Sequence, residues 1–508
     1  MIASEDLFEL IKSLSQTEKR YFKRHCSLNM RRGKNNCLAV FDAVESQREY
    51  DEDKLKNKFR HEKFITQFPV LKNYLYEQIL KSLRSYHRSI HSEVKDLIRN
   101  AEILYEKGLY NRAKKYVLKA KEIARDHEMQ WALLEISRIW EIKMAKKKHD
   151  MHWLKKIMEE SGNEFELLKN TELYKNIELN MFVLYNIHGK ERKKGYLAKM
   201  QKIIESKPMQ NDKTALTFDS KLRFYNTYVL FMHGKGDTGQ MDTYAKKIIA
   251  LYQAHPHKIQ TDLASYVAYL HNLFIATINE KKYSEAAAHL ETMKREFLLS
   301  KNRSQKINHF YYYYSPLLVY YNLTGQFASA IQCIVSFKKQ LEESESAMNM
   351  LEKTVLFANI SVSYFGSGQY KNCIHWLNRL RDEVSLTIRP DFESFLRLFY
   401  IIVHYEVGNM DLLIPLIQSF YRYLKKKEQL YKFETVIIHF FRNELPETDN
   451  QKERIQAFQK LRNKLLPLAK DEYEKNVFEY FDYISWLESK IENKSFAEVV
   501  REKAKQYA

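Results

Sequence analysis

The chain has 508 residues and few that interrupt helices, with 12 glycines and 8 prolines. Hydrophobic residues make up 45% of the chain and charged residues 29%, which excludes a disordered chain and supplies apolar area for a large core. The formal net charge of +19 favours nucleic acids, acidic proteins or anionic surfaces as partners, without choosing among them.

Cysteine usage and the first residues indicate the cellular compartment. The four cysteines are too few and too scattered for a disulfide framework in a chain of this size, which fits a reducing cytoplasm. Acidic Glu5 and Asp6 stand where a secretory signal needs lysine or arginine, and no apolar run follows them. Apolar stretches stay shorter than the roughly 20 residues that cross a bilayer. We therefore expect a cytoplasmic protein without a membrane span.

Residues 1–92 are predicted to form a compact helical module. Ser15 and Glu18 have the spacing of a capping box that opens one helix, and Asp51 can cap another. Pro69 marks the first turn of a further helix, whose apolar residues form a broad face beside basic residues.

The last two helices of this module suggest a DNA-binding hypothesis, because a helix-turn-helix would place the later helix in a major groove. The candidate DNA contacts on that helix are Lys72, Asn73, Gln78, Lys81, Arg84 and Arg88. The connecting segment, residues 61–68, is longer than the usual short turn, and two apolar helices also suit the N-terminal cap of a repeat stack. Both interpretations stay open.

Residues 93–445 contain a recurring pattern: a glycine, an aromatic or large apolar residue two positions later, and a small residue three positions after that. Clear copies begin at Gly108, Gly325 and Gly368, a looser copy begins at Gly408, and a fifth has Lys281 in place of glycine. Glycine tolerates the left-handed turn that ends the first helix of a hairpin, and the small residue allows the second helix to approach closely. The pattern predicts antiparallel helix pairs.

This arrangement resembles the second half of a tetratricopeptide repeat. With weaker turn candidates at Lys148, Gly189 and Gly234, the turns are spaced 40 to 47 residues apart, against about 34 for the standard repeat, so we expect longer helices. The resemblance implies a right-handed solenoid of stacked helix pairs. The predicted fold class is therefore all-α, an alpha-alpha superhelix.

Residues 446–508 are predicted to be C-terminal capping helices. The polar segment 445–450 breaks the chain before them. The large apolar side chains of Trp486 and Phe496 are suited to covering the end of a repeat stack.

The first helices of several predicted pairs are apolar nearly all round, so they need cover on more than one side. The resemblance implies that six side chains face the concave side of the solenoid: Tyr312, Val319, Val362, Phe365, Ile402 and Tyr405. Such a surface suits an apolar peptide or helix. The alternative is that tight curvature or the C-terminal helices of the chain itself bury it.

The sequence lacks the motifs of the common catalytic and cofactor sites. A glycine-rich segment, residues 234–239, lacks the spacing of a phosphate-binding loop and is expected to be a flexible hairpin turn. The nearest candidates for metal ligands are His25, Cys26 and Cys37, expected on helix surfaces, and separately His149 and His152. Neither group supplies a second ligand pair for zinc. We expect no enzyme activity, no cofactor and no small-molecule substrate.

The favoured functional hypothesis is an interaction scaffold that binds a protein or peptide on the concave face of the solenoid. The alternative is a transcriptional regulator, in which residues 1–92 bind DNA and the repeats sense a partner.

Overall fold

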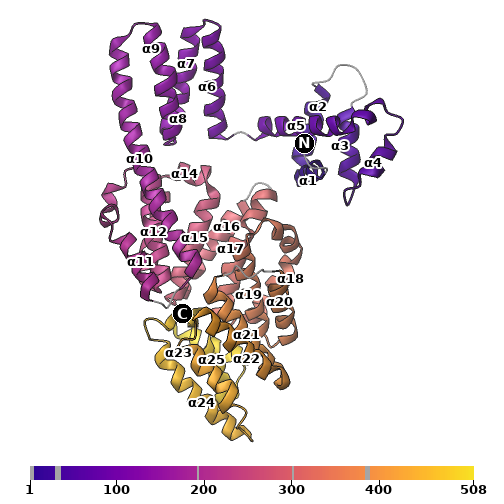
Figure 1. Ribbon diagram of the computed structural model, residues 1–508, viewed down its shortest axis with the longest axis vertical. Helices are drawn as coiled ribbons and strands as arrows, with labels where there is room; N and C mark the ends of the chain where they lie inside the picture. The colour runs from indigo at the N-terminus through magenta and orange to yellow at the C-terminus, as the bar shows by residue number, and fades with distance from the viewer. Residues whose placement is uncertain are drawn as a thin grey trace. The chain divides into compact units, whose positions relative to one another are not determined.

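The structure is a computed structural model that describes residues 5–28, 36–87, 89–190, 194–299, 303–383 and 389–507. Within these ranges every regular element is a helix, and consecutive helices pack against each other (Figure 1). This confirms the all-α superhelical prediction. None of the helices in the described ranges is long and apolar enough to cross a membrane.

The chain divides into two compact units, Met1–Gly162 and Asn163–Ala508. The boundaries that the sequence suggests, after residues 92 and 445, fall inside these units. The first helix pairs of the repeat region belong to the first unit, and the C-terminal helices belong to the second.

The first unit begins with five helices that share one core. They are α1 (Asp6–Ser13), α2 (Gln16–Leu28), α3 (Asn36–Ser46), α4 (Glu52–Lys58) and α5 (Phe68–Tyr86). The predicted caps are confirmed: Ser15 and Glu18 exchange backbone-to-side-chain hydrogen bonds of 2.7 and 3.2 Å, and Asp51 accepts from the Lys54 amide at 2.9 Å. Pro69 stands in the first turn of α5, as expected.

The rest of the first unit is a second helical bundle with its own core. It comprises α6 (Ile90–Glu106), α7 (Tyr110–Asp126), α8 (Gln130–Glu135), a π-helix (Ile136–Glu141), α9 (Ile142–Lys147) and the beginning of α10 (Met151–His188). Lys121 is buried in this bundle and donates to Glu141 at 2.5 Å and to Glu160 at 2.6 Å. A buried charge needs such partners, so the three residues fix α7 against its neighbours.

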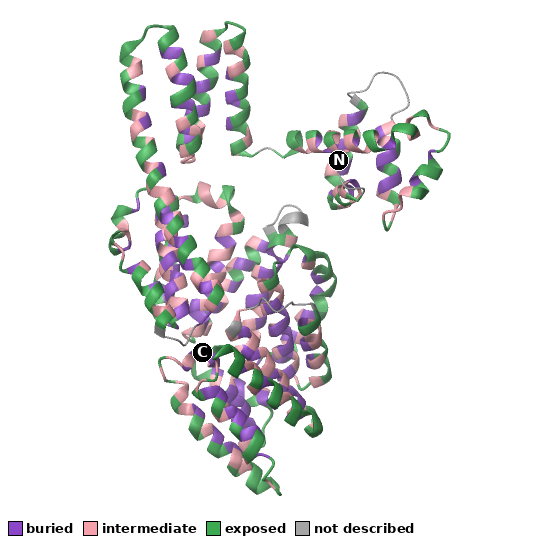
Figure 2. Ribbon diagram, viewed as in Figure 1, coloured by how far each residue is buried: buried purple, intermediate pink, exposed green. Residues whose placement is uncertain are grey.

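The second unit is a stack of helix pairs. Its repeat helices are α11 (Lys194–Ile204), α12 (Phe218–Lys235), α13 (Thr238–Ala254), α14 (Pro256–Thr261), α15 (Leu263–Asn279), α16 (Tyr283–Leu299), α17 (Arg303–Leu323), α18 (Phe327–Ser344), α19 (Met350–Gly366), α20 (Tyr370–Glu383), α21 (Pro390–Val407) and α22 (Met410–Lys427). Besides the contacts within pairs, α15 packs on α17 and α17 on α19, so successive pairs lie against each other. Helix α19 buries Leu356, Phe357 and Ile360 completely, and Figure 2 shows buried positions along this part of the stack.

The C-terminal part begins before the break predicted at residues 445–450, which separates its first two helices from the others. It contains α23 (Lys432–His439), a π-helix (Phe440–Glu444), α24 (Gln451–Leu468), the short 3-10 helix Lys475–Glu479, α25 (Tyr483–Glu492) and α26 (Phe496–Ala504). These helices share one continuous core with α17 to α22. They therefore cover the repeats from one side as well as ending the stack.

The predicted turn register is confirmed at the five copies of the pattern, whereas at the weaker candidate Lys148 the left-handed residue is the next one, His149. The backbone is left-handed at Gly108 (φ 77°), Gly325 (φ 69°), Gly368 (φ 74°) and Gly408 (φ 83°), and at Lys281 (φ 59°) where glycine is replaced. Each of these residues stands between the two helices of a pair, where a left-handed residue ends the first helix.

The turn predicted at Gly234 lies two residues later than the sequence indicates. Helix α12 continues through Lys235, and Gly236 takes the left-handed conformation with a φ of 71°. Helix α13 begins at Thr238, so the glycine-rich segment forms a tight turn and two helix ends.

Close packing at the small position of each pair gives a stability prediction. Ala330 is fully buried in α18, as are Ala113, Ala286 and Cys373 at the matching positions of their pairs. We expect Ala330→Trp to lower the free energy of unfolding by about 1–3 kcal/mol, because the helices have to separate to admit the indole. Urea denaturation measures this change. Val335→Trp is the matched control, since Val335 is 68% exposed on the same helix; equal stability of the two variants would contradict the predicted close approach.

Candidate functional site

The C-terminal helices occupy part of the surface that the sequence suggested as a peptide groove. The ring of Phe365 lies 5.2 Å from that of Phe481 and 5.5 Å from that of Phe496, between centroids. Tyr405 packs edge-on against Trp486 at 6.3 Å. At Phe365 and Tyr405 the predicted groove surface is therefore covered by the C-terminal helices of the chain itself, which is the alternative interpretation of the sequence.

The other predicted groove residues differ in exposure. Ile402 is fully buried, so its side chain lies in the core and does not line an open groove. Tyr312, Val319 and Val362 are half-buried and stay candidates for a partner surface. Burial raises the pKa of Tyr312 well above its usual value, so its phenol remains protonated.

The predicted DNA contacts are only partly available on α5. Lys72 donates to Glu52 at 2.6 Å and to Tyr50 at 3.2 Å, which fixes α5 to the start of α4. The Lys72 ammonium lowers the pKa of Glu52 to about 2. Lys72 is therefore a structural residue in this unit.

The remaining candidates on α5 differ in exposure. Lys81 and Arg84 are exposed, with Arg84 only 4.0 Å from Glu77, while Asn73 and Gln78 are half-buried. Arg88 lies outside the described residues. The connection from α4 to α5 includes a 3-10 helix, Lys63–Gln67, which separates the two helices further than a helix-turn-helix does.

Two candidate metal ligands lie in the core, contrary to the expectation of surface positions. Cys26 and Cys37 are 6% and 2% exposed, and burial raises the pKa of Cys26 to about 11. Among the residues that the structure describes, three or more histidine, cysteine, aspartate or glutamate side chains never gather in a group that could hold a metal ion.

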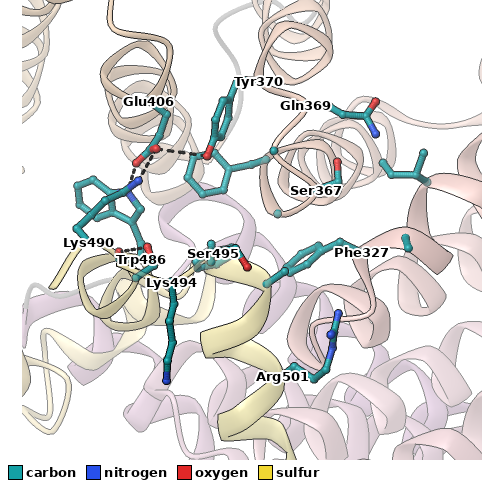
Figure 3. A pocket seen from close by; sticks show the side chains of 18 residues that line it. Phe327, Ser367, Gln369, Tyr370, Glu406, Trp486, Lys490, Lys494, Ser495 and Arg501 are labelled. Carbon is teal, nitrogen blue, oxygen red and sulfur yellow. Dashed lines mark hydrogen bonds and ion pairs between the residues drawn. The ribbon is translucent and has the colours of Figure 1, made fainter. Parts of the chain in front are cut away.

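A cavity of about 600 Å³ opens where the turn between α19 and α20 meets the C-terminal helices (Figure 3). Helix α18 contributes Phe327 and Ala328, and the turn contributes residues 366–370. The opposite side comes from Glu406 near the end of α21 and from α25 and α26. A cavity of this volume has the size of a ligand or peptide pocket.

Five aromatic side chains contribute to the lining of this cavity, namely Phe327, Phe365, Tyr370, Trp486 and Phe496, and the rings of Phe327, Phe365 and Trp486 are almost completely buried behind it. Phe327 reaches the cavity because residue 366 is glycine: a Cβ there would lie 2.1 Å from the Phe327 ring. The ring of Phe496 is 5.7 Å from Phe327 and 5.5 Å from Phe365, so the walls are continuous. Aromatic rings of this kind favour the binding of apolar and aromatic side chains of a peptide.

Glu406 holds the two sides of the cavity together. Its carboxylate accepts from Trp486 Nε1 at 2.7 Å, from Lys490 Nζ at 2.5 Å and from the Tyr370 hydroxyl at 3.3 Å (Figure 3). These donors come from α25 and from the start of α20. The Glu406 side chain is 6% exposed, so it is a structural link and not a free acid.

The remaining charged side chains of the cavity are cationic. Lys494 and Arg501 lie on the α26 side, and Figure 3 shows both at the lower edge of the view. Lys494 forms exposed ion pairs with Glu492 at 3.0 Å and Glu502 at 2.9 Å. Pairs of this kind contribute little energy and exchange readily with a partner's carboxylate. Among the lining residues, three cations, Lys490, Lys494 and Arg501, accompany one anion, Glu406, and the glutamates that pair with Lys494 lie outside the lining.

The sequence indicated the parts of this cavity without indicating that they meet. The sequence pattern predicts a repeat turn at Gly368 and Tyr370 and a capping role for Trp486 and Phe496. Their contact depends on how the C-terminal helices fold back on the repeats, and no local pattern records a contact across such a separation.

In comparisons with known proteins, no protein family matches the chain, and no curated protein matches it.

Proposed function

We propose that the chain is a non-enzymatic interaction protein that holds a peptide segment of a partner in the cavity between the 366–370 turn and α25–α26. The observation that carries this proposal is a cavity of about 600 Å³ whose lining combines mostly buried aromatic rings with two cationic side chains at its edge. An apolar or aromatic side chain next to a carboxylate has the chemistry to fill it.

We also propose that the helix pairs are a long variant of the tetratricopeptide repeat. The left-handed turn residue and the small residue five positions after it support this assignment, as at Gly325 and Ala330. Repeat stacks commonly present peptide-binding surfaces. All four cysteines are free, which supports the proposed location in a reducing cytoplasm.

Filling the cavity tests the proposed function. Ala328 lines the cavity and is exposed in the first turn of α18, so Ala328→Trp should block entry without disturbing the core. We expect this variant to melt at the same temperature as the wild type. The amount of partner protein that it captures should fall about tenfold or more, because a bulky side chain fills a central binding pocket. Affinity capture from the native lysate, with nuclease added and quantified by mass spectrometry, measures the loss.

Val335→Trp again provides the matched control, since it adds the same side chain to an exposed position of α18 away from the cavity. Partner recovery should match that of the wild-type protein. If Ala328→Trp retains every partner that Val335→Trp retains, the cavity is not the binding site and the proposed function is wrong.

A further inference from the structure

A second, smaller pocket lies on different elements of the second unit, between α22 and the segment that follows it. It has a volume of about 230 Å³ and is lined by Ile414, Ile417, Gln418, Tyr421 and Arg422 of α22, with Ile438 and Arg442 opposite. The volume is that of about one large side chain. Ile417 and Ile438 form a buried floor, and Ile414, at 57% exposed, stands open to solvent.

A π-helix places Arg442 beside this pocket. In the segment Phe440–Glu444, both Phe440 and Phe441 are buried, with Phe440 5.2 Å from Phe458 and Phe441 6.2 Å from Trp486. The arginine that follows is exposed. Widened turns of this kind are rare and are found frequently at functional sites.

The two arginines of the pocket are unpaired within the part of the chain that the structure describes. Among the residues that the structure describes, neither Arg422 nor Arg442 forms an ion pair or a side-chain hydrogen bond. The charge is reinforced because α22 ends in three exposed lysines, residues 425–427. Two free guanidinium groups beside an apolar floor lack the carboxylates that would complement them.

We propose that this pocket binds an acidic peptide segment of a partner protein, in which an aliphatic or aromatic side chain is flanked by carboxylates. The apolar side chain occupies the isoleucine floor, and the carboxylates pair with Arg422 and Arg442. This site lies on other elements than the cavity at residues 366–370 and does not depend on it. The two together would let one partner be held at two places.

A synthetic peptide tests this second site directly. The probe is a short fluorescein-labelled peptide with leucines and glutamates at helical spacing, and the matched peptide has glutamine in place of every glutamate. We expect the acidic peptide to bind with saturation in fluorescence anisotropy and the neutral one to bind at least about tenfold more weakly, with the difference shrinking at high salt. In NMR spectra of the full chain with labelled isoleucine methyl groups, the chemical-shift changes caused by the acidic peptide should be confined to Ile414, Ile417 and Ile438.

Charge reversal completes the test. We expect Arg422→Glu with Arg442→Glu to abolish the preference for the acidic peptide, whereas Lys426→Glu, an exposed change on the same helix outside the pocket, should alter it only slightly. Three results would overturn the proposal. The first is that the acidic peptide does not bind with saturation, and the second is that the arginine variant binds it as tightly as the wild-type chain does. The third is that duplex DNA, and not the peptide, changes the chemical shifts of these isoleucines, which would indicate a nucleic-acid interface.

Discussion

Replacing Asp391 with asparagine is expected to lower the free energy of unfolding of the second unit by about 3–5 kcal/mol. The Asp391 carboxylate, whose side chain is 13% exposed, accepts from Arg389 Nη2 at 2.7 Å, from the Lys190 amide at 3.0 Å and from the Tyr480 hydroxyl. These groups join the end of α10, the start of α21 and the segment before α25. Asparagine would leave the buried Arg389 without its counter-charge.

The same carboxylate gives the stability of this unit an acid dependence. Arg389, by its charge and hydrogen bonds, outweighs desolvation and lowers the pKa of Asp391 from 3.8 to about 2. A depressed pKa stabilises the folded state at pH values above 3.8, and this contribution is lost as the pH falls from about 4 towards 2. The Asp391→Asn variant should lack this part of the acid-induced loss of stability.

Urea denaturation at neutral and acidic pH measures both effects. Asp382→Asn is the control, because Asp382 is 67% exposed and its ion pair with Arg381 lies on the surface. That variant should unfold within about 0.5 kcal/mol of the wild type. Equal stability of the Asp391 and Asp382 variants would mean that the buried pair does not hold the second unit together.

Replacing Glu406 with alanine should have the second large effect, a loss of about 3 kcal/mol. The change removes the acceptor of Trp486 Nε1 and leaves Lys490 without its counter-charge at the wall of the large cavity. We expect α25 to loosen from α21 as a result. Relative to the wild type, the rate of hydrogen exchange should then increase more in Tyr483–Glu492 than in the helices of the first unit.

Tyr370→Phe is the matched control for Glu406, since it removes only the hydrogen bond of 3.3 Å to the same carboxylate. Its cost should be about 0.5–1.5 kcal/mol, the usual range for one hydrogen bond. If Glu406→Ala costs no more than Tyr370→Phe and exchange in α25 is unchanged, Glu406 does not link the C-terminal helices to the repeats.

The repeat register could be predicted from the sequence because its causes are local. A left-handed residue such as Gly368 and a small buried residue such as Cys373 are required within one hairpin, five positions apart. The same holds for the caps at Ser15 and Asp51, whose partners lie three residues away. Requirements of this range leave a pattern in the sequence.

The position of each surface could not be predicted, because it depends on contacts between distant residues. Phe365 has the spacing of a concave-face residue, yet Phe496, 131 positions later, covers it. Lys72 has the spacing of a DNA contact, yet Glu52 on another helix binds it. In both cases another side chain of the same chain already contacts the residue that would have bound the peptide or the nucleic acid.

Photo-crosslinking from residue 328 tests the central claim, that the cavity beside the 366–370 turn binds a partner peptide. Benzoylphenylalanine at residue 328 would reach whatever occupies the cavity in the cell, and the same group at residue 335, about two turns further along α18, reports on exposed surface outside the cavity lining. We predict one abundant adduct from residue 328, to a partner segment with an apolar residue beside an acidic one, and no such adduct from residue 335. Identical adducts from both positions, or adducts only within this chain, would contradict the claim.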